Sequence, residues 1–117
     1  MTRKRMPPGV YTAVMERSCV DVMGPLCEVN APGCEWRVSH WHHRKMRSQG
    51  GGHDVVNGLA VCGACHRAIH AAPKAAYAAG WLVRGSSDPA DVLVRVRGAW
   101  TRLTPDGGYG AVETEEK

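Results

Sequence analysis

The sequence contains no phenylalanine, and aromatic residues make up only 6% of its 117 positions. It also has no apolar run that approaches the roughly 18 residues a membrane-spanning helix requires. We therefore expect a single small domain that does not cross a membrane and has a thin hydrophobic core. Fourteen glycines and seven prolines raise the share of loops further. A chain of this kind often depends on a bound metal or on disulfides for its stability.

Acidic residues are also in short supply. Fifteen lysines and arginines stand against eleven aspartates and glutamates, which gives a formal net charge of +4. Residues 113–117 hold three of the acids and one base, so the first 112 residues carry 14 bases against 8 acids. This excess of positive charge suggests a polyanionic partner. Pro7, Pro8 and Gly9 stand where a signal peptide would have its apolar core, so we expect a cytoplasmic protein.

The chain has five cysteines, an odd number that argues against a complete disulfide framework. Without an export signal, metal ligation is the better interpretation of these thiols. Cys62 and Cys65 have the spacing at which two thiolates share one zinc ion. Cys27 and Cys34 form a second pair, with a Pro-Gly turn between them. We predict a structural zinc site made by these four cysteines, the alternative being that some are ordinary buried thiols.

Cys19 is the remaining thiol. It is an alternative to Cys27 as a zinc ligand, but the turn between Cys27 and Cys34 favours that pair. We therefore expect Cys19 to be a buried free cysteine.

Local patterns predict a mixture of helices and strands, that is, the α+β class. The predicted helices cover residues 10–18, a run that begins at Cys62 and is interrupted by Pro73, and residues 74–79, which Gly80 caps. The predicted strands are residues 36–44 and several short strands within residues 81–104. The dipeptide Asn57-Gly58 is typical of a hairpin turn, and the three glycines within residues 47–54 indicate a loop.

We expect one domain over residues 10–104. A flexible basic arm precedes it at residues 1–9, and a turn with an acidic tail follows at residues 105–117. The core is predicted to include all four tryptophans, because the chain has few other large aromatic residues: Trp36, Trp41, Trp81 and Trp100.

Histidines gather at two places. His42 and His43 end the predicted strand 36–44, while His66 and His70 lie four residues apart on one face of the predicted helix. Two imidazoles at this helical spacing often chelate a metal, although a pair of ordinary surface or core histidines is the simpler alternative. We expect His40 to be a packing or substrate-edge residue and expect His53, in the glycine-rich loop, to be exposed to solvent.

Together these residues resemble the HNH nucleases. The resemblance consists of His42-His43, the glycine-rich loop, Asn57 and the run Cys62-x2-Cys65-His66-x3-His70, and it covers about residues 27–80. It implies a ββα-metal core of two strands, a connecting loop and a helix. The sequence is also similar to HNH proteins encoded by bacteriophages, some of which assist DNA packaging. That similarity implies a packaging protein such as the terminase as a partner, in the cytoplasm of a host cell.

The resemblance also implies a role for each motif residue. His43 matches the general base, Asn57 the residue that holds the loop and orients this base, and His66 the final motif histidine, a metal ligand. His42 matches a ligand position that is aspartate in many relatives, and His70 an additional helical ligand of colicin-type members. The four cysteines match the structural zinc site of many members, although six residues between the first two exceed the commoner spacing of two.

These roles predict a metal-dependent endonuclease that hydrolyses DNA phosphodiester bonds with low intrinsic sequence specificity. Three imidazoles favour Mn²⁺, Ni²⁺ or Zn²⁺ over Mg²⁺ as the catalytic metal, although Mg²⁺ also supports such chemistry. DNA contacts are expected from the arm at residues 3–5 and from four further cations: Arg44, Lys45, Arg47 and Arg67. The alternative is a non-catalytic, zinc-bound DNA-binding or adaptor module of a phage assembly. A complete set of His43, Asn57 and His66 argues against it, because an adaptor has no need of a base.

Overall fold

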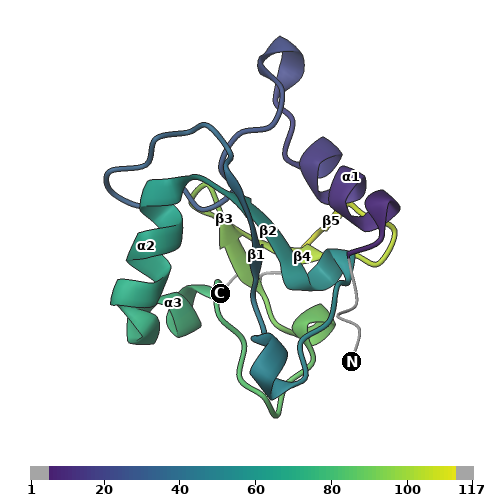
Figure 1. Cartoon of the computed structure of the whole chain (residues 1–117), viewed down its shortest axis with the longest axis vertical. Helices are drawn as coiled ribbons and strands as arrows, with labels where there is room; N and C mark the ends of the chain where they lie inside the picture. The colour runs from purple at the N-terminus through teal and green to yellow at the C-terminus, as the bar shows by residue number, and fades with distance from the viewer. Residues whose placement is uncertain (1–5, 113–117) are drawn as a thin grey trace, which may run out of the picture.

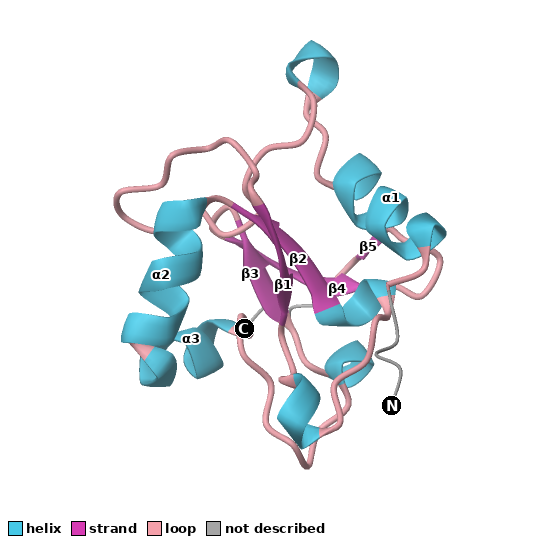
Figure 2. Cartoon of the chain, in the orientation of Figure 1, coloured by secondary structure: helices cyan, strands magenta, loops and turns pink. Residues whose placement is uncertain are grey.

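The computed structural model describes residues 6–112. Within this range the chain forms three α-helices and two small antiparallel sheets, so the predicted α+β class is confirmed (Figures 1 and 2). The helices are α1 (Pro8–Arg17), α2 (Gly63–Ala71) and α3 (Pro73–Ala79). The strands are β1 (His40–His43), β2 (Gly58–Val61), β3 (Val94–Val96), β4 (Ala99–Leu103) and β5 (Tyr109–Gly110). Short 3-10 turns are η1 (Asp21–Met23), η2 (Arg47–Gln49), η3 (Val55–Asn57) and η4 (Pro89–Asp91).

The centre of the molecule is a ββα unit made by β1, β2 and α2. β1 and β2 pair antiparallel, with His40 opposite Val61 and His43 opposite Gly58. The predicted hairpin turn at Asn57-Gly58 is therefore wrong, because Gly58 is already the first residue of β2 and a long loop, residues 44–57, joins the strands. Gly58 has no side chain at a point where an added Cβ would overlap the Trp41 ring. The Trp41 ring can therefore pack directly against the Gly58 backbone on the neighbouring strand.

Local signals place α2 and α3 correctly. The Cys62 side chain accepts a hydrogen bond from the backbone N–H of Cys65 and so caps the start of α2. Pro73 occupies the first turn of α3, where its missing N–H is not needed. Gly80 ends α3 in the left-handed conformation, with φ of +79°. An added Cβ at Gly80 would collide with the Leu93 backbone, so glycine also allows α3 to approach β3.

A second sheet, in the order β3-β4-β5, extends past the predicted end of the domain. The sequence predicts only a turn and a tail after residue 104, whereas a turn at Thr104 returns the chain and Tyr109 pairs with Leu103. The Tyr109 hydroxyl then donates a hydrogen bond to Glu28, far away in sequence. The rest of the predicted acidic tail, residues 113–117, lies outside the described residues.

Helix α1 is fastened to the ββα unit by a buried ion pair. Arg17 Nε lies 2.8 Å from Glu28 Oε2, and the two side chains are almost completely buried. Arg17 also donates hydrogen bonds to the carbonyls of Val55 and Gly58. The predicted basic arm ends earlier than expected, because α1 already begins at Pro8. Residues 1–5 of that arm lie outside the described residues.

The core is built mainly from aliphatic side chains and cysteines. It includes Val29, Val56, Leu59, Val61, Ile69, Ala76, Leu82, Val94, Val96 and Leu103. Two of the tryptophans predicted to be buried are not core residues, because 45% of Trp36 and 47% of Trp100 is exposed. Trp36 lies in the loop before β1 and adopts a positive φ of 67°.

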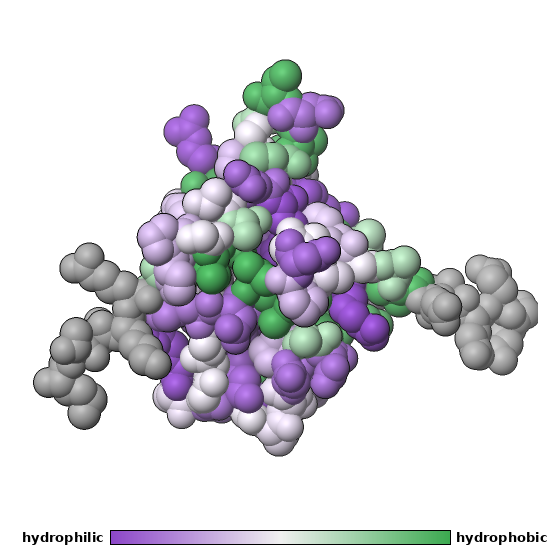
Figure 3. Space-filling model, turned by 90° about the vertical axis from the view of Figure 1, so that its right-hand side faces the viewer, coloured by the Kyte–Doolittle hydropathy of each residue, from purple (hydrophilic) through white to green (hydrophobic). Residues whose placement is uncertain are grey.

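The surface is mostly polar, with small apolar groups. The turn η1 projects at the top of Figure 1 and carries Val22, which is fully exposed, and Met23. Figure 3 shows hydrophilic residues over much of one face, interrupted by small hydrophobic areas. Among the described residues, no helix has both the length and the apolar character needed to cross a bilayer.

Candidate active site and metal centres

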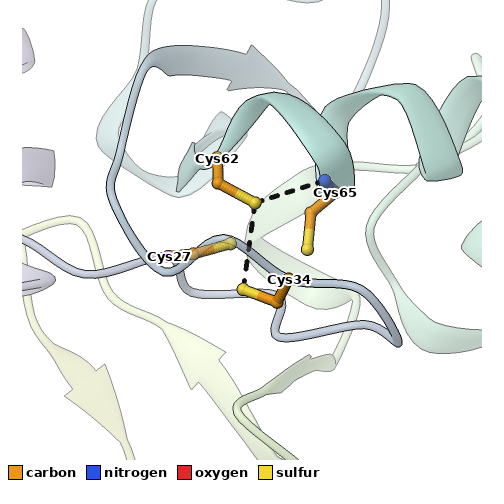
Figure 4. A group of neighbouring side chains, drawn as sticks. All are labelled: Cys27, Cys34, Cys62 and Cys65. Atoms are coloured by element: carbon orange, nitrogen blue, oxygen red, sulfur yellow. Dashed lines mark hydrogen bonds between the residues drawn. The ribbon is translucent and has the colours of Figure 1, made fainter.

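The four predicted zinc ligands converge on one point. Cys27 and Cys34 come from the loop before β1, and Cys62 and Cys65 from the start of α2 (Figure 4). All four sulfur atoms lie within 4.8 Å of one another. Cys19 is not part of this group and is exposed rather than buried, its thiol donating to the Met15 carbonyl at the end of α1.

Backbone N–H groups surround the sulfur atoms and favour thiolates. Cys62 Sγ accepts from the N–H groups of Glu35 and Cys65, both at 3.3 Å, and Cys65 Sγ accepts from Ala31 at 3.4 Å. Burial alone would raise the pKa of Cys62, but these backbone donors and the neighbouring thiols outweigh it and lower that pKa to about 7. Burial raises the pKa of Cys34 and of Cys65.

This donor set fits a structural zinc ion. In a tetrahedral site with Zn–S bonds of about 2.3 Å, the sulfur atoms lie roughly 3.8 Å apart. Cys34 Sγ and Cys62 Sγ are separated by 3.8 Å. Four thiol ligands leave no open coordination position, which is typical of a structural rather than a catalytic site. The cluster can therefore hold the loop before β1 against the start of α2.

A second cluster consists of three histidines. His42 lies on β1, and His66 and His70 lie one turn apart on α2, as their spacing predicts. One ring nitrogen of each lies within 4.8 Å of the others. The rings of His66 and His70 meet edge to face, with their centroids 4.8 Å apart. Three imidazoles leave coordination positions open, so this donor set fits a catalytic divalent metal.

His42 is held in one orientation by a carbonyl. Its Nε2 lies 2.8 Å from the Trp81 carbonyl oxygen. Because a carbonyl only accepts hydrogen bonds, Nε2 carries the proton and Nδ1 keeps the lone pair that a metal requires. Burial, with a smaller contribution from the charges of the neighbouring histidines, lowers the pKa of His42 to about 4. Burial likewise lowers the pKa of His66, so both rings are neutral near pH 7.

His43 follows directly and faces the same open pocket, of about 270 Å³. The pocket is lined by Trp41, His42, His43, Met46, Arg47, His66 and His70. Strand β1 ends at His43, whose ring packs against Trp41 with centroids 4.7 Å apart, and His42 and His43 both line the pocket. Burial lowers the pKa of His43, and the charges of His53 and Arg47 act in the same direction. A neutral imidazole therefore borders the three-histidine cluster.

His53 is not exposed to solvent as predicted. Its Nδ1 lies 3.1 Å from Nε2 of His43, and its own Nε2 is buried. The glycine-rich loop folds back because the buried Asn57 side chain forms hydrogen bonds with its backbone. Asn57 Nδ2 donates to the carbonyls of Gly52 and Lys45, and Asn57 Oδ1 accepts from the Lys45 N–H at 2.7 Å.

Arg44, predicted to contact DNA, is fully buried. Its guanidinium donates hydrogen bonds to four backbone carbonyls, those of Val56, Gly80, Pro89 and Val92. Burial lowers its pKa to about 10, with the nearby charge of Arg17 adding to this effect. The prediction is wrong because the sequence shows a cation beside the motif but not the loop at residues 80–92 that closes over it. Arg44 ties that loop to the ββα unit.

The other described cations predicted to contact DNA lie at different places, and of them only Arg47 lines the pocket. Arg47 is exposed and lines it, and Arg67 is exposed on α2. Lys45 is half-buried, and its Nζ donates to the Ser87 carbonyl. His40, which the sequence leaves outside the ligand set, is exposed, and its ring stacks on His66 with centroids 4.5 Å apart.

A comparison with protein families matches residues 32–72 to the HNH endonuclease family. This segment is an HNH domain. It contains β1, β2 and α2, with all three histidines of the cluster, His43 and Asn57. No curated protein and no solved structure matches the chain. The HNH domain supports a nuclease-type function in general, and the family implies DNA as the substrate.

Proposed function

We propose that this protein is a metal-dependent HNH endonuclease that hydrolyses DNA phosphodiester bonds. The observation that carries the proposal is the arrangement in one pocket of three converging imidazoles, from His42, His66 and His70, beside the neutral ring of His43. A binding module has no use for a free imidazole next to a metal-chelating set, whereas hydrolysis needs both.

His43 acts as the general base. Its lowered pKa keeps the ring neutral near pH 7, so one ring nitrogen can take a proton from a water molecule. The oxygen of that water attacks phosphorus, the bond from phosphorus to the 3′ oxygen breaks, and the departing 3′ oxygen takes a proton from solvent water. This leaves a 5′-phosphate and a 3′-hydroxyl group, as the family resemblance implies. A divalent metal held by His42, His66 and His70 would supply Lewis-acid stabilisation of the charge at the phosphate.

Asn57 orders the loop that surrounds the base. Its side chain bridges Lys45, on one side of the loop, and Gly52, on the other. None of its hydrogen bonds reaches His43, so its action on the base is indirect. The bridge fixes both ends of the loop that begins two residues after His43.

DNA binds through its phosphates. Arg47 lines the pocket, Arg67 is exposed on α2, and Lys45 lies in the loop after His43. Phosphate contacts of this kind provide affinity without sequence readout. Helix α2, which lines the pocket with His66 and His70, carries mainly metal-ligand and alanine side chains and only one long side chain typical of major-groove recognition, Arg67. We therefore propose low intrinsic sequence specificity.

The four-cysteine cluster holds a structural zinc ion in this proposal. Such an ion contributes directly to folding, which suits a core without phenylalanine. A packaging protein such as the terminase is the proposed partner, on the basis of the similarity to bacteriophage HNH proteins. The projecting apolar turn η1 is a candidate contact for it, and co-purification of the terminase with the wild type but not with a Val22→Ser variant tests this contact.

Cleavage of supercoiled plasmid tests the proposed function. Purified zinc-loaded protein is incubated with plasmid and Mg²⁺, Mn²⁺, Ni²⁺ or EDTA, at low and moderate salt. We expect nicked or linear product with at least one of the metals and none with EDTA. A folded protein that binds the plasmid but cleaves it with none of these metals contradicts the proposal. That result favours the non-catalytic DNA-binding or adaptor module.

A further inference from the structure

His53 lies against the proposed base in the only direct polar contact that the described residues make to the His43 side chain. His43 Nε2 and His53 Nδ1 are 3.1 Å apart, and the ring centroids are separated by 5.2 Å. The position of His53 is fixed from behind, because Asn57 Nδ2 donates a hydrogen bond to the carbonyl of Gly52, the preceding residue. A continuous set of contacts thus leads from Asn57 through the loop to His43.

We propose that His53 is a positioning residue for His43, and this inference rests on the proposed function, in which His43 is the general base. In this pair His43 Nε2–H donates a hydrogen bond, and His53 Nδ1 accepts it. His43 Nδ1 then keeps its lone pair for the reacting water. A base needs a free lone pair, and Nε2 is already occupied by His53, so Nδ1 is the nitrogen available for catalysis.

The His43 ring is held from a second side as well. The Trp41 ring contacts it edge to face, with centroids 4.7 Å apart. The centroids of the Trp41 and His53 rings are 6.4 Å apart, so the three rings form one packed group. Packing restricts rotation of the His43 ring, and the hydrogen bond from Nε2 selects its tautomer. When His43 takes the proton of water, Nε2–H becomes part of an imidazolium and its bond to His53 strengthens.

Two buried polar atoms without hydrogen-bond partners lie in rings beside His43, and they indicate that His53 has a functional rather than a space-filling role. Among the described residues, the buried side-chain polar atoms without a hydrogen-bond partner are His53 Nε2 and Trp41 Nε1. Both belong to rings that contact His43. An apolar ring in place of His53 would fill the same space without an unpaired nitrogen. What histidine adds at this position is the acceptor Nδ1.

Two substitutions separate the acceptor from the ring. His53→Phe keeps an aromatic ring against Trp41 but removes the acceptor. His53→Asn places an amide oxygen near the position of Nδ1. Asp54→Ala is the matched control, because Asp54 is exposed on the same loop and its side chain makes no cap to η3. The kcat and KM for duplex cleavage, the melting temperature and the metal content are measured for each.

We expect His53→Phe to lower kcat about 10-fold to 100-fold, as is typical when the orienting partner of a functional imidazole is lost. Its KM, melting temperature and metal content should match those of the wild type. His53→Asn should recover most of the lost kcat, and Asp54→Ala should leave kcat unchanged. A His53→Phe protein with wild-type kcat overturns the inference, as does an equal loss of kcat in the Asn and Phe variants.

A second measurement does not depend on turnover. Nitrogen-15 NMR of histidine-labelled protein reports which nitrogen of His43 carries the proton. We expect Nε2–H for His43 in the wild type and in His53→Asn, and a mixture of tautomers in His53→Phe. A wild-type His43 protonated at Nδ1 overturns the inference while leaving metal-dependent cleavage intact. If the wild type has the expected tautomer but cleaves no DNA with any metal, the proposed function fails instead, and with it the catalytic role of the pair.

Discussion

Cys65 and His66 are consecutive residues of α2, yet their side chains belong to different clusters, one of sulfur atoms and one of imidazoles. The first turn of α2 therefore carries residues of both the proposed structural centre and the proposed catalytic centre. Any ion held by the cysteines fixes the start of the helix that presents His66 and His70. Loss of the structural centre should consequently disturb the histidine cluster, whereas loss of a histidine should leave the cysteines unaffected.

We expect Cys62→Ser to remove the structural zinc and to destabilise the fold. A tetrahedral site that loses one of four thiolates loses most of its affinity, and the core without it is thin. The melting temperature should fall by about 10 °C or more, and zinc content by metal analysis should fall with it. Cys19→Ser is the control, because Cys19 is exposed and outside the cluster. Equal melting temperatures for Cys62→Ser and Cys19→Ser would remove the structural zinc from this description.

His70→Ala should impair the histidine cluster and leave the cysteine cluster intact. The variant loses one of three imidazole ligands but keeps all four thiols. We expect a wild-type chain to bind one metal ion at the cysteines and one at the histidines. In His70→Ala the cysteine site should keep its ion, while the affinity of the histidine site for Ni²⁺ or Mn²⁺ should fall at least about 10-fold. Titration calorimetry on zinc-loaded protein measures this directly. Unchanged Ni²⁺ binding by the variant would mean that the three histidines do not hold a metal together.

Arg44 and Arg47 should behave differently although both lie near the pocket. Arg44→Met leaves four buried or partly buried carbonyls without their donor and should lower the free energy of unfolding by about 3 kcal/mol or more. Arg47→Ala should leave stability unchanged within about 0.5 kcal/mol, since the side chain is exposed.

The same pair of variants separates stability from DNA binding. We expect Arg47→Ala to weaken binding and to reduce the slope of log affinity against log salt by about 1. Urea unfolding and fluorescence anisotropy at several salt concentrations provide the two measurements. A stable Arg44→Met protein with weakened DNA binding would restore the original prediction that Arg44 contacts DNA.

Glu28→Gln should destabilise the protein by about 3–5 kcal/mol, because it leaves the guanidinium of Arg17 buried without a counter-ion. Glu28 also accepts hydrogen bonds from the Ala60 N–H and the Tyr109 hydroxyl, so it links α1, β2 and β5. Tyr109→Phe removes only the last of these and should have a smaller effect, of about 1 kcal/mol. Equal urea midpoints for Glu28→Gln and the wild type would show that this ion pair does not hold α1 in place.

The parts of this protein that could be predicted from sequence are those encoded by short spacings. Cys62, Cys65, His66 and His70 follow one another on one helix, so helical periodicity alone brings their side chains together. The cap at Gly80 and the break at Pro73 are equally local. The grouping of Cys27 and Cys34 with the helix needed a second consideration, the requirement of zinc for four ligands.

The parts that were missed depend on contacts between distant segments. Arg44 is buried only because the loop at residues 80–92 folds over it. Tyr109 forms β5 because Glu28 and β4 offer it partners. His53 turns inward because the Asn57 side chain donates a hydrogen bond to the Gly52 carbonyl. Three successive glycines allow this loop conformation, but they do not predict it. None of these has a signature in the neighbouring sequence.

The most direct test of the central claim compares the wild type with His43→Ala in plasmid cleavage, after equal melting temperatures and metal contents have been established. We predict metal-dependent cleavage by the wild type and a loss of about 100-fold or more in the variant, because general-base catalysis is removed while the metal ligands remain. Cleavage by His43→Ala at the wild-type rate would contradict the role of His43 and the mechanism built on it.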